Sequence, residues 1–276
     1  MTGHPKGGVG MLQTIATIWL VSSVICTIWL AYELRRQPAI MKMMKVAWLL
    51  ITLYLGVIGL WLYVAACREP EPGTHDAFVA PMWKQAVGSV MHCVAGDALG
   101  IVAAATTTSW FSLPMAQDMV VEYIAGFLVG WLLFQTIPMM RMNGTTFTQE
   151  LRSAFVAEFL SLTFMVMGMF PTMAYLMNIW NVMSPADPTF WFVMSTSILV
   201  GSLVAYPINW WMVRRGMKHG MGGSRVLGQG GVQDHAHHPS DNRHDGHHQE
   251  GLPEQSVHAA YVERVKKQDS RRGHRH

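Results

Sequence analysis

The residues best suited to chemistry lie within an apolar run that extends from Ala86 to Trp110. His92, Cys93 and Asp97 place an imidazole, a thiol and a carboxyl group in that run. It is long enough to cross a bilayer as a helix. An ionisable group near the middle of a membrane costs about 2.5–3.5 kcal/mol on insertion scales, so it is seldom retained without a use. The pattern therefore predicts a polar site inside a membrane.

Two further carboxyl groups lie within apolar runs. Glu158 lies about as far into its apolar run as His92 lies into the run that begins at Ala86. The helices predicted for these two runs point the same way. We therefore expect Glu158 and His92 to share a depth, where each stabilises the charged form of the other. Asp97 and Glu158 are predicted to carry protons or to balance charge. Glu122 joins this path if it faces inward, and is a solvated interfacial carboxylate if it does not.

Soft donors follow Glu158 along the same helix. Met165 and Met169 continue the side of the helix that Glu158 occupies. Thioethers suit Cu(I), and an imidazole with a thiolate adds to that preference, so His92, Cys93 and these methionines predict a soft-metal site. The alternative is that the methionines only fill gaps in apolar packing.

The segment after the last apolar run adds more candidate ligands. Met217, His219 and Met221 form a Met-x-His-x-Met pattern that would suit a soft metal. The tail beyond it is polar and histidine-rich, and we expect it to be disordered. Its imidazoles predict loose buffering of zinc, nickel or copper, with a solubilising tail as the alternative. These tail histidines are His235, His237, His238, His244, His247 and His248.

Composition explains what must position these groups. Of the 276 residues, 51% are hydrophobic and 13% are charged, which is far below the charge content of a soluble domain. The apolar residues gather into six continuous runs of membrane-spanning length, which predict six transmembrane helices. The runs are Leu12–Tyr32, Val46–Ala66, Ala86–Trp110, Met119–Met140, Phe155–Met177 and Phe190–Val213.

We therefore predict an all-α membrane protein in four parts. Residues 1–67 form a two-helix hairpin, and residues 68–82 form a linker rich in proline and acidic side chains. Residues 83–216 form a four-helix transmembrane domain, and residues 217–276 form the tail. The three cysteines, Cys26, Cys67 and Cys93, lie in or beside apolar runs and suggest no disulfide framework.

Basic residues near the ends of the runs predict an orientation. Lys84, Arg141 and Arg214 fall on one face of the four-helix domain, which places that face and both termini in the cytoplasm. The turn between the first two helices disagrees with this orientation. Its basic residues would then lie outside, namely Arg35, Arg36, Lys42 and Lys45.

Three segments together resemble a bacterial polytopic inner-membrane family that is catalogued only as a domain of unknown function. They are Met41–Tyr63, the His92-Cys93-x-Ala95-Gly96 segment, and Tyr206-Pro207-x-Asn209-Trp210 through Lys218, and the likeness covers Ile40–Gly222. In the segment that corresponds to His92–Ile101, members of this family carry a pattern similar to His-Cys-x-Ala-Gly-Cys-x-x-Gly-Asp. This chain carries Asp97 in place of the second cysteine and Ile101 in place of the aspartate, which weakens a site with two thiolates. An association of members with copper-handling neighbours implies copper as the metal.

Function is predicted from these features together. The first interpretation is an inner-membrane protein that binds or moves a soft metal ion, with copper expected. The second is a proton- or cation-coupled permease for a small solute, and the third is a non-catalytic partner or assembly subunit. No hydrolase or nucleotide-binding motif is present, so we expect no enzymatic activity. The expected partners are the lipid bilayer, metal-handling proteins or further copies of the chain; no folded basic surface predicts nucleic acid.

Overall fold

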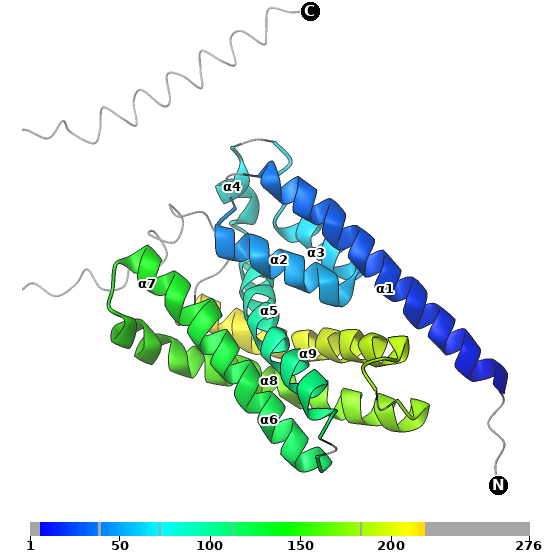
Figure 1. Cartoon of the computed structure of the whole chain (residues 1–276). Coiled ribbons are helices and arrows are strands. Elements are labelled where there is room, and N and C mark those ends of the chain that lie inside the picture. Colours follow the sequence, from blue (N-terminus) through cyan, green and yellow to red (C-terminus); the bar gives the residue numbers. More distant parts are fainter. Residues whose placement is uncertain (1–5, 38–39, 72, 112, 183, 219–276) are drawn as a thin grey trace, which may run out of the picture. The chain divides into compact units, whose positions relative to one another are not determined.

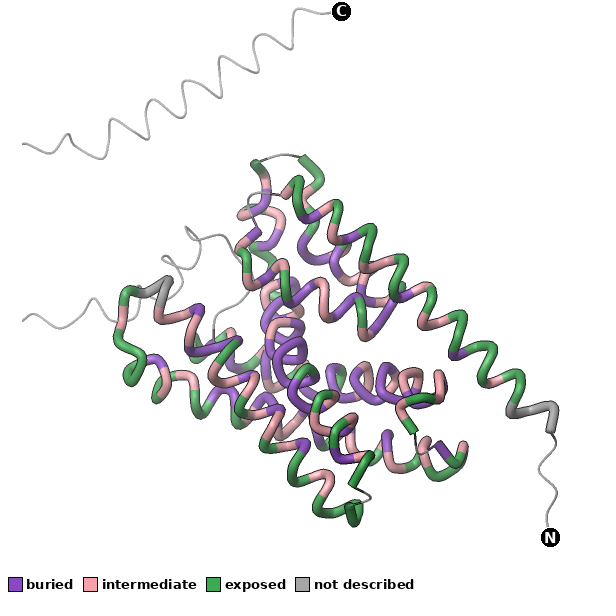
Figure 2. Tube along the Cα trace, in the orientation of Figure 1, coloured by how far each residue is buried: buried purple, intermediate pink, exposed green. Residues whose placement is uncertain are grey.

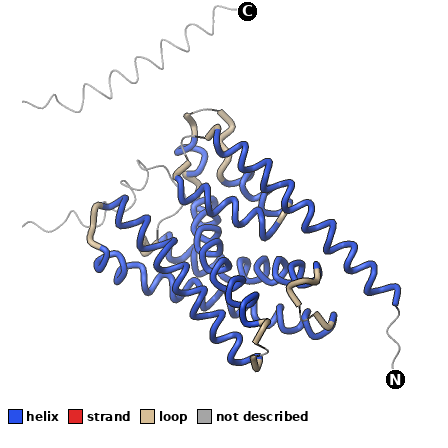
Figure 3. Tube along the Cα trace, viewed as in Figure 1, coloured by secondary structure: helices blue, strands red, loops and turns tan. Residues whose placement is uncertain are grey.

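The computed structural model describes residues 6–37, 40–71, 73–111, 113–182 and 184–218 (Figure 1). Every regular element in these ranges is a helix, as Figure 3 shows, so the predicted all-α class is confirmed. The helices are α1 (Lys6–Arg35), α2 (Lys42–Leu55), α3 (Val57–Ala66), α4 (His75–Val79), α5 (Met82–Thr108), α6 (Met115–Leu128), η1 (Val129–Thr136), α7 (Ile137–Asn143), α8 (Phe147–Trp180) and α9 (Pro188–Arg214).

Five stretches are long and apolar enough to cross a membrane, which supports a multi-pass membrane protein. The described residues therefore contain one candidate span fewer than the six predicted. The third to sixth predicted runs each correspond to one candidate span. The candidates are Gly10–Arg35, Met82–Thr108, Met115–Met140, Phe147–Trp180 and Pro188–Arg214.

The second predicted run does not form one helix. The run Val46–Ala66 breaks at Gly56, which has φ 55° and ψ −128° and separates α2 from α3. The chain then folds back, because the rings of Trp48 and Tyr63 lie 5.7 Å apart although a continuous helix would hold them far from each other. The prediction of a single span was wrong here because hydropathy does not register a reversal at one glycine.

The α2–α3 hairpin begins and ends at the same place in the structure. Arg68, just after α3, forms an ion pair with Glu33 near the end of α1, with 3.0 Å between Nε and Oε1. Lys45, near the start of α2, donates a hydrogen bond from Nζ to the Leu34 carbonyl at 2.9 Å. The beginning of α2 and the end of α3 therefore both lie beside the C-terminal end of α1.

The first helices belong to the same compact unit as the later ones. α1 packs against α9, and α2 packs against α5. The segment predicted as a linker, residues 68–82, contains α4, and two α4 side chains, those of His75 and Val79, are buried. The predicted tail lies outside the described residues apart from its first two positions, Met217 and Lys218.

α5 is the central helix of this unit, and Figure 2 shows the middle of its trace mostly in the colour of buried residues. Within its apolar window 78% of residues are buried, against 17% for α1. Small residues explain the close approach of its neighbours. A Cβ added at Gly96 would meet the ring of Phe134, and one added at Gly100 would strike the backbone of Ala125. The predicted polar residues of α5 are therefore enclosed by other helices.

Candidate functional site

At the centre of the site is a residue of η1 that has no side chain. η1 is a π-helical stretch inside the third candidate span, and such stretches occur frequently at functional sites. Gly130 lies in it, and a Cβ added there would strike both Oδ1 of Asp97 and Oε1 of Glu158. The missing side chain thus leaves space in which a carboxyl group from α5 and one from α8 meet.

We call Asp97 and Glu158 the acid pair. Both residues have an exposed fraction of 0%. None of their four carboxyl oxygens has a hydrogen-bond partner among the residues that the structure describes. Like charges in a medium of low dielectric constant repel strongly. The acid pair therefore requires a proton or a cation for each negative charge that it would otherwise hold.

Lys218 provides one positive charge close to the acid pair. It follows the end of α9 by four residues, yet its exposed fraction is only 7%. Cys93, Glu158 and Asp97 all act on its ammonium electrostatically. Burial alone lowers the pKa of Lys218, but these groups outweigh burial and the net pKa lies above its usual value.

Asn209 of α9 holds this ammonium. Its Oδ1 accepts a hydrogen bond from Nζ of Lys218 at 2.8 Å. The amide nitrogen of Asn209 donates to Oγ of Ser161 and to the Ala205 carbonyl, each at 2.9 Å. Because the amide nitrogen has both partners inside the bundle, the oxygen is oriented towards Lys218.

Cys93 completes the polar cluster, which we define as the acid pair with Cys93, Gln135, Ser161, Asn209 and Lys218. The Cys93 side chain is fully buried, and its Sγ accepts a hydrogen bond from Nε2 of Gln135 at 2.7 Å. Glu158, Lys218 and Asp97 all act on the thiol electrostatically. The cluster therefore draws on α5, η1, α8, α9 and the residues just after α9.

His92 differs from its neighbours. Its side chain is partly buried, and its ring packs edge-to-face on Phe134 with the centroids 5.7 Å apart. The sequence predicted that Glu158 would lie beside the imidazole of His92. In the structure Glu158 meets Asp97 instead, because Gly130 offers space to the carboxyl group that lies one turn further along α5 than His92.

The two predicted methionine ligands of α8 are fully buried, in contact with α9. Met165 and Met169 each have an exposed fraction of 0%. A Cβ added at Gly201 of α9 would meet the Met165 carbonyl oxygen and Cγ and the Met169 Cβ at 2.8–3.2 Å. These contacts fit the packing interpretation of the two residues.

Glu122 is buried rather than solvated at an interface. Its exposed fraction is 1%, and its Oε2 has no hydrogen-bond partner among the described residues. It shares the side of α6 on which Gly126 lies, four residues before Gly130. The interfacial alternative was therefore wrong, and Glu122 is a separate buried carboxyl group on the α6 side that faces α5.

Of the Met-x-His-x-Met pattern predicted after α9, only the first residue lies in the described part of the chain. Met217 is 43% exposed, whereas the adjacent Lys218 enters the polar cluster. His219 and Met221 lie outside the described residues, as do the six tail histidines that were predicted to buffer metal. Across the described part of the chain, no group of three or more His, Cys, Asp and Glu side chains is arranged to hold a metal ion.

Four members of the polar cluster were not among the predicted site residues, namely Gln135, Ser161, Asn209 and Lys218. A signal existed for Lys218, because glycine just after a helix favours a reversal of the chain. Gly216 has φ +68°, and the backbone N–H of Met217 donates to the Met212 carbonyl at 3.0 Å. This reversal turns the following residue back towards α9. Gln135 carried no comparable signal, since its contact depends on the path of η1.

The five long apolar helices support a multi-pass membrane protein, and in its described part ionisable groups are enclosed between helices. Residues 82–218 match the family described as "Domain of unknown function (DUF4396)". The resemblance inferred from the sequence is therefore confirmed for α5 to Lys218, and residues 40–81 lie outside the matched range. No curated protein and no solved structure matches the chain.

Proposed function

We propose that this protein is a proton- or cation-coupled permease for a small solute, and that the acid pair carries the coupled charge. The observation that supports this proposal is the meeting of Asp97 and Glu158 at Gly130, fully buried and without hydrogen-bond partners among the described residues. Intramembrane carboxyl groups facing a bundle interior are typical of ion and proton pathways.

The charges of the cluster support coupling to a single positive charge. Lys218 offsets one of the two carboxylates, and the second requires one proton or one monovalent cation. Loading and release of that charge would change the electrostatics of a site in which water is scarce. Such a change biases two arrangements of the helices differently, which is the requirement for coupled transport.

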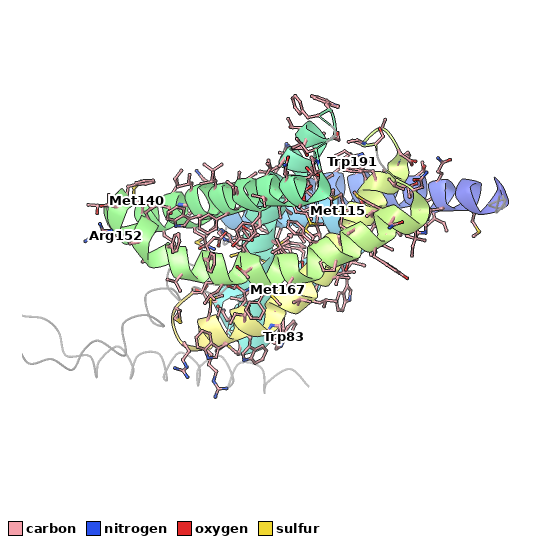
Figure 4. The ribbon with its side chains drawn as sticks, turned by 90° about the horizontal axis from the view of Figure 1, so that it is seen from below. Trp83, Met115, Met140, Arg152, Met167 and Trp191 are labelled. Carbon is pink, nitrogen blue, oxygen red and sulfur yellow. The ribbon has the colours of Figure 1, made fainter. Side chains whose placement is uncertain are left out.

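We propose the inner membrane of a bacterium as the location, with the C-terminus in the cytoplasm and the N-terminus outside. Because the α2–α3 hairpin returns to its own side, five crossings place the termini on opposite sides. Figure 4 shows Met140 and Arg152 at one end of the bundle and Met115 and Trp191 towards the other. The basic residues of the first turn then share the cytoplasmic side with Lys84 and Arg214, which removes the disagreement noted in the sequence.

Reporter fusions test this orientation. A periplasm-active reporter at the N-terminus and a cytoplasm-active reporter at the C-terminus are both expected to be active. Activity of a cytoplasmic reporter at both ends would show instead that the α2–α3 hairpin crosses the membrane.

Proton movement tests the role of the acid pair. In proteoliposomes with an imposed membrane potential, we expect wild-type protein to admit protons, read by an internal pH-sensitive dye. Asp97→Asn and Glu158→Gln are each expected to lower the rate by about 100-fold, because loss of a proton-carrying group removes at least that much from a proton-transfer step. Glu71→Gln is the matched control, since Glu71 is an exposed carboxylate in a loop. Wild-type rates in both acid-pair variants would contradict the proposal.

We propose soft-metal binding, with copper expected, as a second function. It is supported by the enclosed Cys93 thiol next to His92, although Cys93 has Gln135 as its hydrogen-bond partner. Anaerobic Cu(I) titration of the full chain is expected to show one equivalent fewer bound in His92→Ala/Cys93→Ala than in wild type. Equal stoichiometry in the two proteins would assign all copper binding to residues outside this site.

A further inference from the structure

Glu122 is a buried carboxyl group that lies outside the polar cluster. Within α6, all of which the structure describes, only Glu122 and Gly126 are buried. The exposed fraction of Glu122 is 1%, and its Oε2 has no hydrogen-bond partner among the described residues. A buried polar atom without a partner is rare in folded proteins, so each one calls for an explanation.

Two glycines continue the side of α6 on which Glu122 lies. Gly126 and Gly130 follow it at intervals of four residues, which places all three on one side of this span. A Cβ added at Gly126 would lie 3.1 Å from the Asp97 carbonyl oxygen, and one added at Gly130 would strike Oδ1 of Asp97. The span therefore presents no side chain of its own to α5 between Glu122 and the acid pair on this side.

Asp118 lies at the other end of the same side, one turn before Glu122. Its side chain is partly exposed. Its Oδ1 accepts a hydrogen bond from Oγ1 of Thr108, the last residue of α5. The beginning of α6 and the end of α5 are thus joined at the end of the bundle that we propose to face outside. Carboxyl groups therefore follow one another inward from that end, from Asp118 to Glu122 to the acid pair.

The side chain of Ile101 lies between Glu122 and the acid pair. A Cβ added at Gly126 would meet Cγ1 of Ile101 at 2.8 Å, and the exposed fraction of Ile101 is 0%. The rise of a helix separates Glu122 from Gly130 by about 12 Å, whereas a hydrogen bond spans only about 3 Å. A proton can cross this distance only if water enters, and an apolar side chain packed on Gly126 excludes water there.

We infer that Glu122 is the outer proton-binding group of a path to the acid pair, and that the Ile101 side chain closes this path between them. A proton from outside water binds the Glu122 carboxylate. When Ile101 moves and water enters, that proton passes to a carboxylate of the acid pair and Glu122 becomes a carboxylate again. The inference deepens the proposed function, on which it rests, by naming the residue that delivers the coupled proton.

Proton uptake tests the role of Glu122. In the proteoliposome assay, Glu122→Gln is expected to lower the rate by about 100-fold, because a group that transfers the proton is lost. Glu122→Asp keeps a carboxyl group and is expected to recover much of the rate. Glu150→Gln is the matched control, since Glu150 is also buried but accepts a hydrogen bond from Thr145 at 2.7 Å. Loss of uptake in Asp97→Asn with normal uptake in Glu122→Gln would overturn the inference and retain the proposed function.

Thiol labelling tests the path without depending on transport. The full chain is used with its native cysteines replaced by serine, namely Cys26, Cys67 and Cys93. A small, charged methanethiosulfonate reagent is applied to the outer side. Glu122→Cys is expected to react, whereas Asp97→Cys is expected to react far more slowly. Glu122→Cys that reacts only from the cytoplasmic side would overturn the inference.

The same reagent tests the closure at Ile101. Ile101→Ala is expected to raise the labelling rate of Asp97→Cys about tenfold, equal to about 1.4 kcal/mol in the opening equilibrium. Ile51→Ala is the matched control, because Ile51 is equally buried but lies on α2. An unchanged rate in Ile101→Ala would show that Ile101 does not close the path. If Asp97→Cys does not fold, Ile101→Ala alone serves, with higher proton uptake expected and unchanged uptake contradicting the closure.

The two assays distinguish the inference from the proposed function. The expected labelling pattern together with proton uptake that does not respond to Asp97→Asn would reject the proposed transport and retain a water path closed at Ile101. Proton uptake that depends on the acid pair but not on Glu122, with Glu122→Cys unreactive from outside, would retain the transport and reject the path.

Discussion

Gly130→Ala is expected to abolish proton uptake while the protein remains folded. The added methyl group would strike Oδ1 of Asp97 and Oε1 of Glu158 at the same time, so both carboxyl groups must leave their meeting point. Because the clash involves the ends of two side chains, they move rather than the helices, at a cost of about 1–3 kcal/mol in folding free energy. Proton uptake in proteoliposomes is expected to fall to the rate of Asp97→Asn.

Two comparisons make this result specific. Gly10→Ala adds the same methyl group to α1, where nothing lies within 4 Å, and is expected to leave uptake unchanged. Gly130→Ala/Glu158→Asp shortens one of the displaced side chains and is expected to recover a measurable part of the uptake. Normal uptake by Gly130→Ala would show that the meeting of the acid pair at this glycine is not required.

Lys218→Met is expected to destabilise the protein far more than the loss of any neighbouring charge. Loss of the buried ammonium leaves Oδ1 of Asn209 without its charged donor, and a hydrogen bond to a charged group contributes about 1.5–3 kcal/mol. The free energy of unfolding, measured by denaturing-detergent titration, is expected to fall by that amount. Arg215→Met is the matched control, because Arg215 is exposed three positions earlier and its loss is expected to change stability by less than about 0.5 kcal/mol.

A double-mutant cycle identifies the cause of that loss. If Lys218 stabilises the protein by offsetting the acid pair, Asp97→Asn is expected to be less harmful in Lys218→Met than in wild type, and even to recover stability there. The expected coupling energy is about 0.5–3 kcal/mol. Additive effects of the two substitutions would mean that Lys218 acts only through its contact with Asn209.

The sequence predicted which residue types form much of the site, but not which of these residues contact each other. The desolvation cost of a carboxyl group in lipid marks Asp97 and Glu158 as functional candidates without any coordinates. Which partner each would meet depends on the path of a third segment, η1, whose Gly130 leaves space for the acid pair. Helical periodicity within α5 and α8 carries no information about that path, so the sequence did not predict that Asp97 and Glu158 would meet at Gly130.

The number of candidate spans likewise depends partly on local sequence and partly on contacts in the folded chain. Hydropathy identified the five stretches that are long enough to span, because the cost of transferring an apolar side chain is a local property. It also joined α2 and α3 into one run, because their residues are equally apolar on both sides of Gly56. Only the contact between Trp48 and Tyr63 shows that the chain turns back there.

The amino-acid sequence by itself determined that this is an all-helical membrane protein with ionisable groups placed within its apolar segments. These properties follow from side-chain chemistry and from spacing along a single helix. The tertiary structure alone decided that the chain turns back at Gly56, that the two acids meet each other, and that Lys218 is buried with its ammonium on Asn209. Each of these depends on contacts between residues far apart in the chain, which are set by backbone reversals and close packing at glycines rather than by local pattern.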